Sequence, residues 1–238
     1  NNTTGKIIKA CVPMHTFGHP CRIDEIKDIC DKYYISLIED AAESLGSFYK
    51  GRHTGNWGVM SALSFNGNKV ITTGGGGAIL TNDGNLAKEA KHLTTTAKVA
   101  HQWEYIHDKI GYNYRLPNIN AALGCAQLEQ LPNHLKSKRK LAKRYQKAFE
   151  NVDGVRFHLE SKDTHCNYWL NVLLLDESLT LERDSILAMT NDKNIMTRPV
   201  WKLLSNLPMF KDHPKMNLNI AESLERRLVN LPSSPNIV

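Results

Sequence analysis

Short apolar runs alternate with a segment of helical periodicity in the first third of this 238-residue chain. Residues 7–13 and 35–38 predict strands on either side of an amphipathic helix over 23–33, and residues 61–65 and 78–81 predict two more strands. Such alternation favours an α/β layer with a largely parallel sheet, in which ligands bind beyond the carboxyl ends of the strands. We therefore expect functional side chains near residue 40, just after the strand over 35–38.

The pattern changes near residue 150, where we place a boundary between two domains. A helix over 85–95 and a long helical region over 118–149, interrupted near Pro132, complete the domain of residues 1–150. Residues 151–238 predict a smaller α+β domain. Its expected elements are strands over 155–157, 168–174 and 196–200 and helices over 181–190 and 220–229.

Composition and charge exclude several classes of protein. The 41% hydrophobic content suffices for a sizeable core, and no apolar run reaches the 18 residues that a membrane span needs. The net charge of +6 is concentrated only at residues 136–144, which we interpret as a solvated helix face and not as a nucleic-acid site. Five cysteines without a Cys-x-x-Cys pair fit reduced thiols in a cytoplasm. The first residues resemble neither a signal peptide nor a methionine start, so we expect a soluble chain that lacks its beginning.

Lys69 lies beside a glycine run, Gly74–Gly77, and Asp40 follows an upstream apolar strand. A lysine amine forms a Schiff base with an aldehyde, and a carboxylate keeps a pyridine nitrogen protonated. This combination suits pyridoxal phosphate (PLP), whereas the alternative is an ordinary solvated lysine in a turn. The glycine run lacks the spacing of a dinucleotide-binding loop and predicts either a turn with close backbone approach or a flexible loop.

Four motifs together resemble the DegT/DnrJ/StrS family of sugar aminotransferases. The likeness extends over nearly the whole chain, and the motifs keep the order of the family, which a chance match to one short pattern would not produce. It implies the fold of PLP-dependent aspartate aminotransferases (fold type I), with an N-terminal part of the large domain absent before residue 1. The motifs are residues 39–47, 64–69, 74–77 and 111–117.

The resemblance also implies a reaction. The sequences of the motifs are most similar to those of enzymes that aminate C4 of a nucleotide-linked 4-keto-6-deoxyhexose or N-acetylhexosamine. Such enzymes act in polysaccharide biosynthesis, as in perosamine, bacillosamine or legionaminic acid routes. Such an enzyme takes the amino group from an amino acid, expected to be glutamate, and passes it to the keto sugar nucleotide in a second half-reaction. The alternative is an inactive fragment or a non-catalytic protein of the same fold.

The resemblance implies roles for five residues. Lys69 holds the cofactor covalently and later moves a proton, and Asp40 pairs with the pyridinium nitrogen. Glu43 stands where relatives carry His or Gln near the ring oxygen, although an ionised carboxylate would repel a phenolate there. Ser64 matches a serine that binds the phosphate, and Asn113 matches an asparagine that reaches the phosphate from the partner subunit. The last assignment implies a homodimer with shared active sites.

Like Lys69, the other four residues each have a structural alternative. His15 and His19 lack further ligands that would complete a metal shell, so we expect no metal site. Arg198 is expected either to hold a substrate anion or to form a structural salt bridge. The alternatives are a helix N-cap for Asp40, a solvated helix glutamate for Glu43, a plain strand-end serine for Ser64 and a turn or capping residue for Asn113.

Overall fold

The structure, a computed structural model, describes residues 3–237. These residues form two compact units. The first comprises residues 9–134 and 162–167, and the second comprises the remaining described residues. Helix α3 (Asn118–Phe149) begins in the first unit and ends in the second. The domain boundary that we expect at residue 150 stays a prediction, because the units reflect the proximity of residues and not independent folding.

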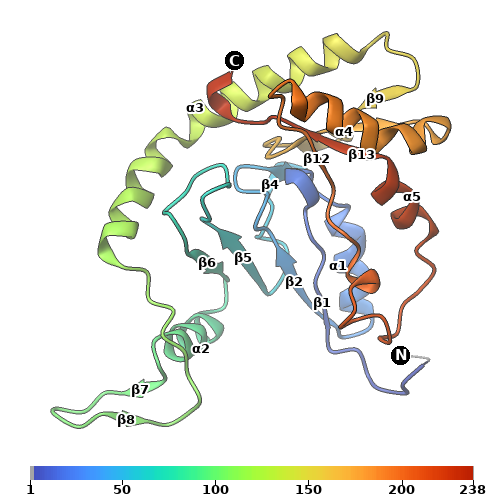
Figure 1. The fold of residues 1–238 in the computed structure, drawn as a ribbon. Coiled ribbons are helices and arrows are strands. Elements are labelled where there is room, and N and C mark those ends of the chain that lie inside the picture. The colour runs from blue at the N-terminus through green and yellow to red at the C-terminus, as the bar shows by residue number, and fades with distance from the viewer. Residues whose placement is uncertain (1–2, 238) are drawn as a thin grey trace. The chain divides into compact units, whose positions relative to one another are not determined.

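A four-stranded sheet in the order β1-β2-β5-β6 is the main sheet of the first unit (Figure 1). Strands β1, β2 and β5 are parallel, and β6 runs antiparallel to β5 at one edge. The sheet is therefore largely parallel, as the alternating pattern predicts. Its strands are β1 (Ala10–Cys11), β2 (Ser36–Asp40), β5 (Met60–Ser64) and β6 (Gly77–Leu80).

Helix α1 (Ile23–Lys32) connects β1 to β2 and packs against β2. Two acidic residues in its first turn and Lys32 in its last turn complement the helix dipole. Ile23 and Cys30, two turns apart on one face, are buried in a hydrophobic cluster with Leu37 of β2. This packing holds in place the strand that ends at Asp40.

Shorter elements complete the first unit. Helix α2 (Gly84–Thr94) begins after Asp83, whose carboxylate accepts hydrogen bonds from two backbone N–H groups of the first turn. Strands β3, β4 and β10 form a small antiparallel sheet, and the β7–β8 hairpin extends beyond α2 (Figure 1). The short elements are η1 (Thr16–Gly18), β3 (Phe48–Tyr49), β4 (Arg52–His53), β7 (Lys98–Val99), β8 (Ile106–His107) and β10 (Thr164–His165).

The second unit has an antiparallel sheet in the order β12-β13-β11-β9. Helix α4 contacts β13, and helix α5 contacts β11, so the unit combines helices with an antiparallel sheet. Its elements are β9 (Val155–Phe157), β11 (Asn171–Leu175), η2 (Glu177–Glu182), α4 (Arg183–Asp192), β12 (Arg198–Pro199), η3 (Leu204–Asn206), α5 (Asn219–Arg227), β13 (Leu228–Leu231) and η4 (Pro235–Ile237).

Two expectations about secondary structure are wrong. Helix α3 continues through Pro132 without interruption, because the loss of one backbone donor does not stop the helical hydrogen bonds on either side. The helix expected over 220–229 ends at Arg227, and the next residues form β13, which pairs with β11. Over residues 3–237, every helix falls short of the length and apolar character that crossing a membrane requires.

The basic cluster over 136–144 is not uniformly solvated. Lys138 is buried, and its Nζ donates to the carbonyl oxygens of Trp169 at 3.1 Å and Ser233 at 2.6 Å. Arg139 forms a bidentate ion pair with Glu160: Nη2 lies 2.7 Å from Oε1, and Nη1 lies 2.8 Å from Oε2. At least these two charges therefore serve the structure of the second unit.

Candidate functional site

The carboxyl ends of β2 and β5 lie side by side, because Asp40 pairs in register with Ala62 and β5 ends two residues later at Ser64. The chain then turns, and the backbone N–H of Lys69 donates to the carbonyl oxygen of Asn66 at 3.0 Å. The N–H of Asn66 donates to Ser64 Oγ at 3.3 Å. The structure thus brings Asp40, Ser64 and Lys69 to one edge of the sheet, where ligands of parallel sheets bind.

The half-buried Lys69 and the buried Glu43 form a pair of opposite charge. Lys69 Nζ lies 3.9 Å from Glu43 Oε1, and the two side chains are 13% and 8% exposed. The other carboxylate oxygen, Oε2, accepts a hydrogen bond from the backbone N–H of Phe17 at 2.7 Å. Glu43 lies in a turn after β2 and not in a helix. Neither a solvated turn lysine nor a solvated helix glutamate therefore describes these residues.

Burial shifts the proton affinity of both groups. Burial lowers the pKa of the Lys69 amine below its ordinary value of 10.5, although the negative charges of Glu43 and Asp40 act in the opposite direction. Burial raises the pKa of Glu43 above its ordinary value, while the Phe17 N–H and Lys69 lower it and Asp40 raises it further. A lysine with a lowered pKa has a larger neutral fraction, and the neutral amine is the nucleophile.

Asp40 is fixed by both its backbone and its side chain. Its N–H donates to the carbonyl oxygen of Pro13 at 2.9 Å, and its own carbonyl oxygen accepts from the N–H of His15 at 3.1 Å. Its Oδ1 accepts from the N–H of Ala42 at 3.1 Å. Since a turn and not a helix follows β2, Asp40 stabilises a turn, and the N-cap alternative does not hold.

Hydrogen bonds from two neighbouring residues, Phe17 and Asn167, hold Glu43 in place. Phe17 has a left-handed backbone with φ of 61°, an uncommon conformation for a non-glycine residue, and it aims its N–H at Glu43. Ser47 Oγ donates to the carbonyl oxygen of Gly18 at 2.7 Å. Asn167 Nδ2 donates to the carbonyl oxygen of Glu43 at 2.8 Å. Sequence reasoning missed Phe17 and Asn167, because the Asn167 contact joins residues 124 positions apart and no local pattern signals it.

His15 belongs to a second buried network. Its Nε2 lies 3.0 Å from Glu39 Oε2, and both side chains are fully buried. Its Nδ1 accepts from the N–H of Cys21 at 3.2 Å, which places the ring proton on Nε2 and toward Glu39. Among residues 3–237, no group of His, Cys, Asp and Glu side chains is arranged to hold a metal ion.

Three further candidates lie on other segments. Ser64 is half-buried at the end of β5, and the exposed Asn113 pairs through its backbone with Thr95 near the β7–β8 hairpin. Arg198, in the second unit, donates through Nη1 to Asn191 Oδ1 at 2.6 Å and to the carbonyl oxygen of Thr197 at 2.7 Å. These bonds join Arg198 to neutral groups. The expected roles of Ser64, Asn113 and Arg198 in binding ligands stay predictions.

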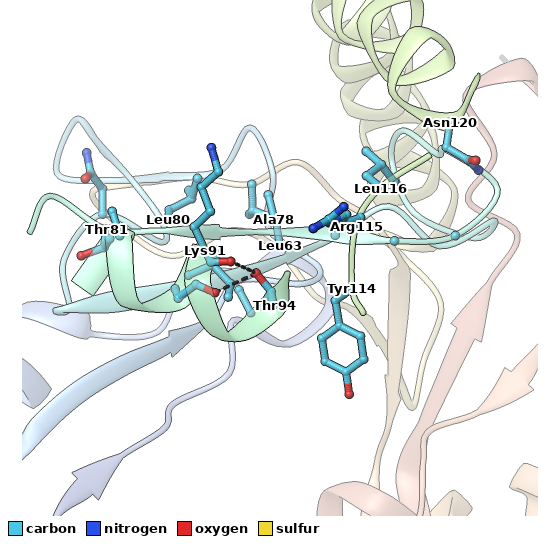
Figure 2. A pocket seen from close by; sticks show the side chains of 18 of the residues that line it. Leu63, Ala78, Leu80, Thr81, Lys91, Thr94, Tyr114, Arg115, Leu116 and Asn120 are labelled. Carbon is cyan, nitrogen blue, oxygen red and sulfur yellow. Dashed lines mark hydrogen bonds between the residues drawn. The ribbon is translucent and has the colours of Figure 1, made fainter. Parts of the chain in front are cut away.

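A wide cleft of the first unit lies elsewhere. It has a volume of about 1100 Å³, and Lys69, Asp40, Glu43 and Ser64 are not among the residues that line it. Figure 2 shows side chains from β6, α2 and the segment before α3 along this groove. The charged pair, and not this cleft, therefore marks the candidate site. Labelled lining residues include Leu63, Ala78, Leu80, Lys91, Thr94, Tyr114, Arg115, Leu116 and Asn120.

Curated proteins are similar in sequence to this chain. The chain is 39% identical over 238 residues to a putative pyridoxal phosphate-dependent aminotransferase, EpsN of Bacillus subtilis, covering 98% of this chain and 60% of that protein. It is 41% identical over 233 residues to GDP-perosamine synthase of Escherichia coli O157:H7, covering 96% of this chain and 61% of that protein. The chain thus spans about three fifths of the length of these curated relatives.

The comparison with solved structures agrees with the comparison of sequences. The structure matches that of Helicobacter pylori PseC, an aminotransferase involved in the biosynthesis of pseudoaminic acid, with a TM-score of 0.92 and 25% identity over 97% of this chain and 62% of that one. The expected aminotransferase fold is therefore confirmed. The model of the DegT/DnrJ/EryC1/StrS aminotransferase family matches residues 1–238. With a match over the whole sequence and a shared fold, the chain belongs to the DegT/DnrJ/EryC1/StrS aminotransferase family.

Proposed function

We propose that the complete protein is a PLP-dependent aminotransferase that moves an amino group from an amino acid, expected to be glutamate, to C4 of a nucleotide-linked 4-keto-6-deoxy sugar. The observation that carries this proposal is the half-buried Lys69 amine at the carboxyl ends of β2 and β5. Its lowered pKa favours the neutral form, which reacts with carbonyl carbons.

The chemistry of the donor groups fits PLP. Lys69 offers an amine to the aldehyde, Asp40 offers an anion to the ring nitrogen, and Ser64 offers a hydroxyl to the phosphate. Glu43 is expected near the ring oxygen, and Asn113 is expected to reach the phosphate from a second copy of the chain. When bound, the cofactor supplies an aldehyde carbon and an electron sink.

The residues of this chain supply proton transfer and orientation. Once its amine is free, Lys69 would take a proton from the α carbon of the amino-acid donor in the first half-reaction and would give a proton to C4 of the sugar in the second. Its low exposure of 13% limits competition from water. Asp40 keeps its place because its backbone is hydrogen-bonded on both sides, to Pro13 and His15.

The relatives support a nucleotide-linked acceptor. One is named GDP-perosamine synthase, and one structural match is an aminotransferase involved in the biosynthesis of pseudoaminic acid. The choice of C4 rests on the sequence of the motifs, which resembles that of C4 aminotransferases, and the choice of glutamate is what the family resemblance implies.

Reduction with borohydride tests the cofactor site. The complete protein is incubated with PLP, its absorbance spectrum is recorded, and the adduct is reduced and mapped by mass spectrometry. We expect the label on the Lys69 peptide, the same label in Lys50→Ala, whose lysine is an exposed partner of Asp24, and none in Lys69→Ala. A complete protein that takes up no PLP would favour the non-catalytic alternative.

A substrate panel tests the reaction. The complete protein is supplied with glutamate and with GDP-, UDP- and TDP-linked 4-keto-6-deoxy sugars, and amination is followed by mass spectrometry. We expect one nucleotide class to gain an amino group at C4, and Lys69→Ala to lose this activity by several orders of magnitude. Amination at another carbon, or equal turnover by Lys69→Ala, contradicts the proposal.

A further inference from the structure

The distance between Glu43 and Lys69 brings proton exchange within reach. Their closest atoms, Oε1 and Nζ, are 3.9 Å apart, about 1 Å longer than an N–H···O hydrogen bond. A small rotation of the lysine side chain or one bridging water closes such a gap.

Glu43 is held with one oxygen toward the amine. Its Oε2 is engaged by the N–H of Phe17 at 2.7 Å, and its carbonyl oxygen is engaged by the amide of Asn167 at 2.8 Å. These contacts fix the backbone and the far carboxylate oxygen, while Oε1 faces Lys69. The hydrogen bond from Phe17 does not require a charged acceptor, so it can persist when Glu43 is protonated.

The surroundings of the pair bring its ionised and neutral forms closer in free energy. Burial disfavours both the ammonium and the carboxylate, so the ionised pair and the neutral pair lie closer in free energy than they do in water. Asp40, at the end of β2, also acts on both members, and it favours a proton on each.

We propose, on the basis of the function proposed above, that Glu43 is a positioning residue that shares one proton with Lys69: its carboxylate holds the ammonium form in place, and it receives the proton of the ammonium when the amine becomes neutral. In this step the Nζ–H bond breaks and an Oε1–H bond forms, and the total charge of the pair does not change. The protonated carboxyl also no longer repels a phenolate oxygen, which removes the conflict that a carboxylate at position 43 otherwise creates. The reverse transfer restores the ammonium.

The first test is the pH dependence of Lys69 reactivity in the complete protein freed of cofactor. Competitive labelling with acetic anhydride, read by mass spectrometry of the Lys69 peptide, reports the neutral fraction of the amine. In Glu43→Gln the Phe17 N–H keeps an oxygen acceptor, but the charge next to Lys69 is gone. Because that charge raises the pKa of the amine, we expect the labelling midpoint to fall by about 1 pH unit or more. Glu25→Gln, an exposed site on α1, leaves the midpoint unchanged.

A second measurement tests the proposal independently, in case Glu43→Gln does not fold. The infrared carbonyl stretch of protonated carboxyl groups is compared between the parent and Lys69→Met as the pH is raised. Removal of the ammonium lets Glu43 keep its proton to higher pH, so we expect an additional protonated band that persists in Lys69→Met. An unmoved labelling midpoint in folded Glu43→Gln, or identical infrared titrations, overturns the proposal. Both measurements are made without PLP, so they decide on the pair even if the protein binds no cofactor.

Discussion

At the scale of single residues, the buried carboxylate of Glu39 takes part in four hydrogen bonds. Its carboxylate faces His15 and accepts backbone N–H groups of Gly55 at 2.7 Å, Trp57 at 2.6 Å and Gly58 at 2.8 Å. Burial alone raises the pKa of such a carboxyl, but the bonds from His15 and the three N–H groups outweigh it and hold the pKa of Glu39 below its ordinary value of 4.5. The ionised form is thus built into the fold.

We expect Glu39→Gln to lower the free energy of unfolding by about 3 kcal/mol at pH 7, because an amide cannot accept all these donors. Since the folded-state pKa is lower than the unfolded-state pKa, the ionised carboxylate stabilises the fold above pH 4.5, and this stabilisation is lost as the pH falls through the folded-state pKa. The gap between the parent and the variant therefore narrows below pH 4.5. Urea unfolding at several pH values measures it.

Glu25→Gln is the control for this prediction. Glu25 is an exposed residue of α1 that pairs only loosely with Arg22, at 3.4 Å, so its replacement changes stability by less than about 0.5 kcal/mol. A gap between parent and Glu39→Gln that stays constant from pH 7 to pH 3 would show that Glu39 is not ionised in the folded protein.

Local patterns located part of the site and not the rest. Asp40 and Lys69 could be predicted because a strand end and a glycine run mark their neighbourhoods, and the structure brings them to one edge of the sheet. Phe17 and Asn167 could not be predicted, because they meet residue 43 across 26 and 124 positions of sequence. Such contacts arise only when the whole unit has folded.

At the scale of elements, the antiparallel pair β5–β6 couples the glycine run to the site. Gly77 pairs in register with Ser64, and a Cβ at Gly77 would overlap the carbonyl oxygen of Leu63. The predicted close backbone approach is thus confirmed at Gly77, whereas Gly75 has open space within 4 Å of such a Cβ. The run therefore contains positions of different tolerance.

We expect Gly77→Ala to lower the free energy of unfolding by about 1–3 kcal/mol, because the strands must separate to admit the methyl group. It is also expected to weaken PLP binding, because Ser64 lies opposite Gly77. Gly75→Ala, the matched control, stays within about 0.5 kcal/mol of the parent. Urea unfolding and PLP titration measure both variants, and equal behaviour of the two would contradict the role of β5–β6 pairing.

Element prediction succeeded where one segment carries its own signal. The helix expected over 23–33 is observed as α1, and the strand expected over 155–157 is observed as β9. The strand β13 was missed because Leu228–Leu231 continues the apolar spacing of α5, and only pairing with β11, more than fifty residues earlier, makes it extended. Tertiary context decides such segments.

At the scale of the whole molecule, the segment between α2 and α3 exposes large apolar side chains. Trp103, Tyr105 and Ile110 are 69%, 81% and 84% exposed, and Asn113 follows them. Clustered exposed apolar side chains mark surfaces that contact other chains. This exposure supports the proposal that a homodimer forms and that Asn113 of one subunit serves the site of the other.

Mixed dimers test this sharing of sites. Lys69→Ala and Asn113→Ala are each expected to aminate at less than about a tenth of the parent rate, because one loses the amine and the other a phosphate contact. The two variants are co-expressed with different tags, and the heterodimer is purified. If Asn113 acts across the interface, one of its two sites combines an intact Lys69 with an intact Asn113, so roughly half of the parent activity returns. If Asn113 acts within its own subunit, neither site is complete and no activity returns, which refutes the shared site while leaving the role of Lys69 intact.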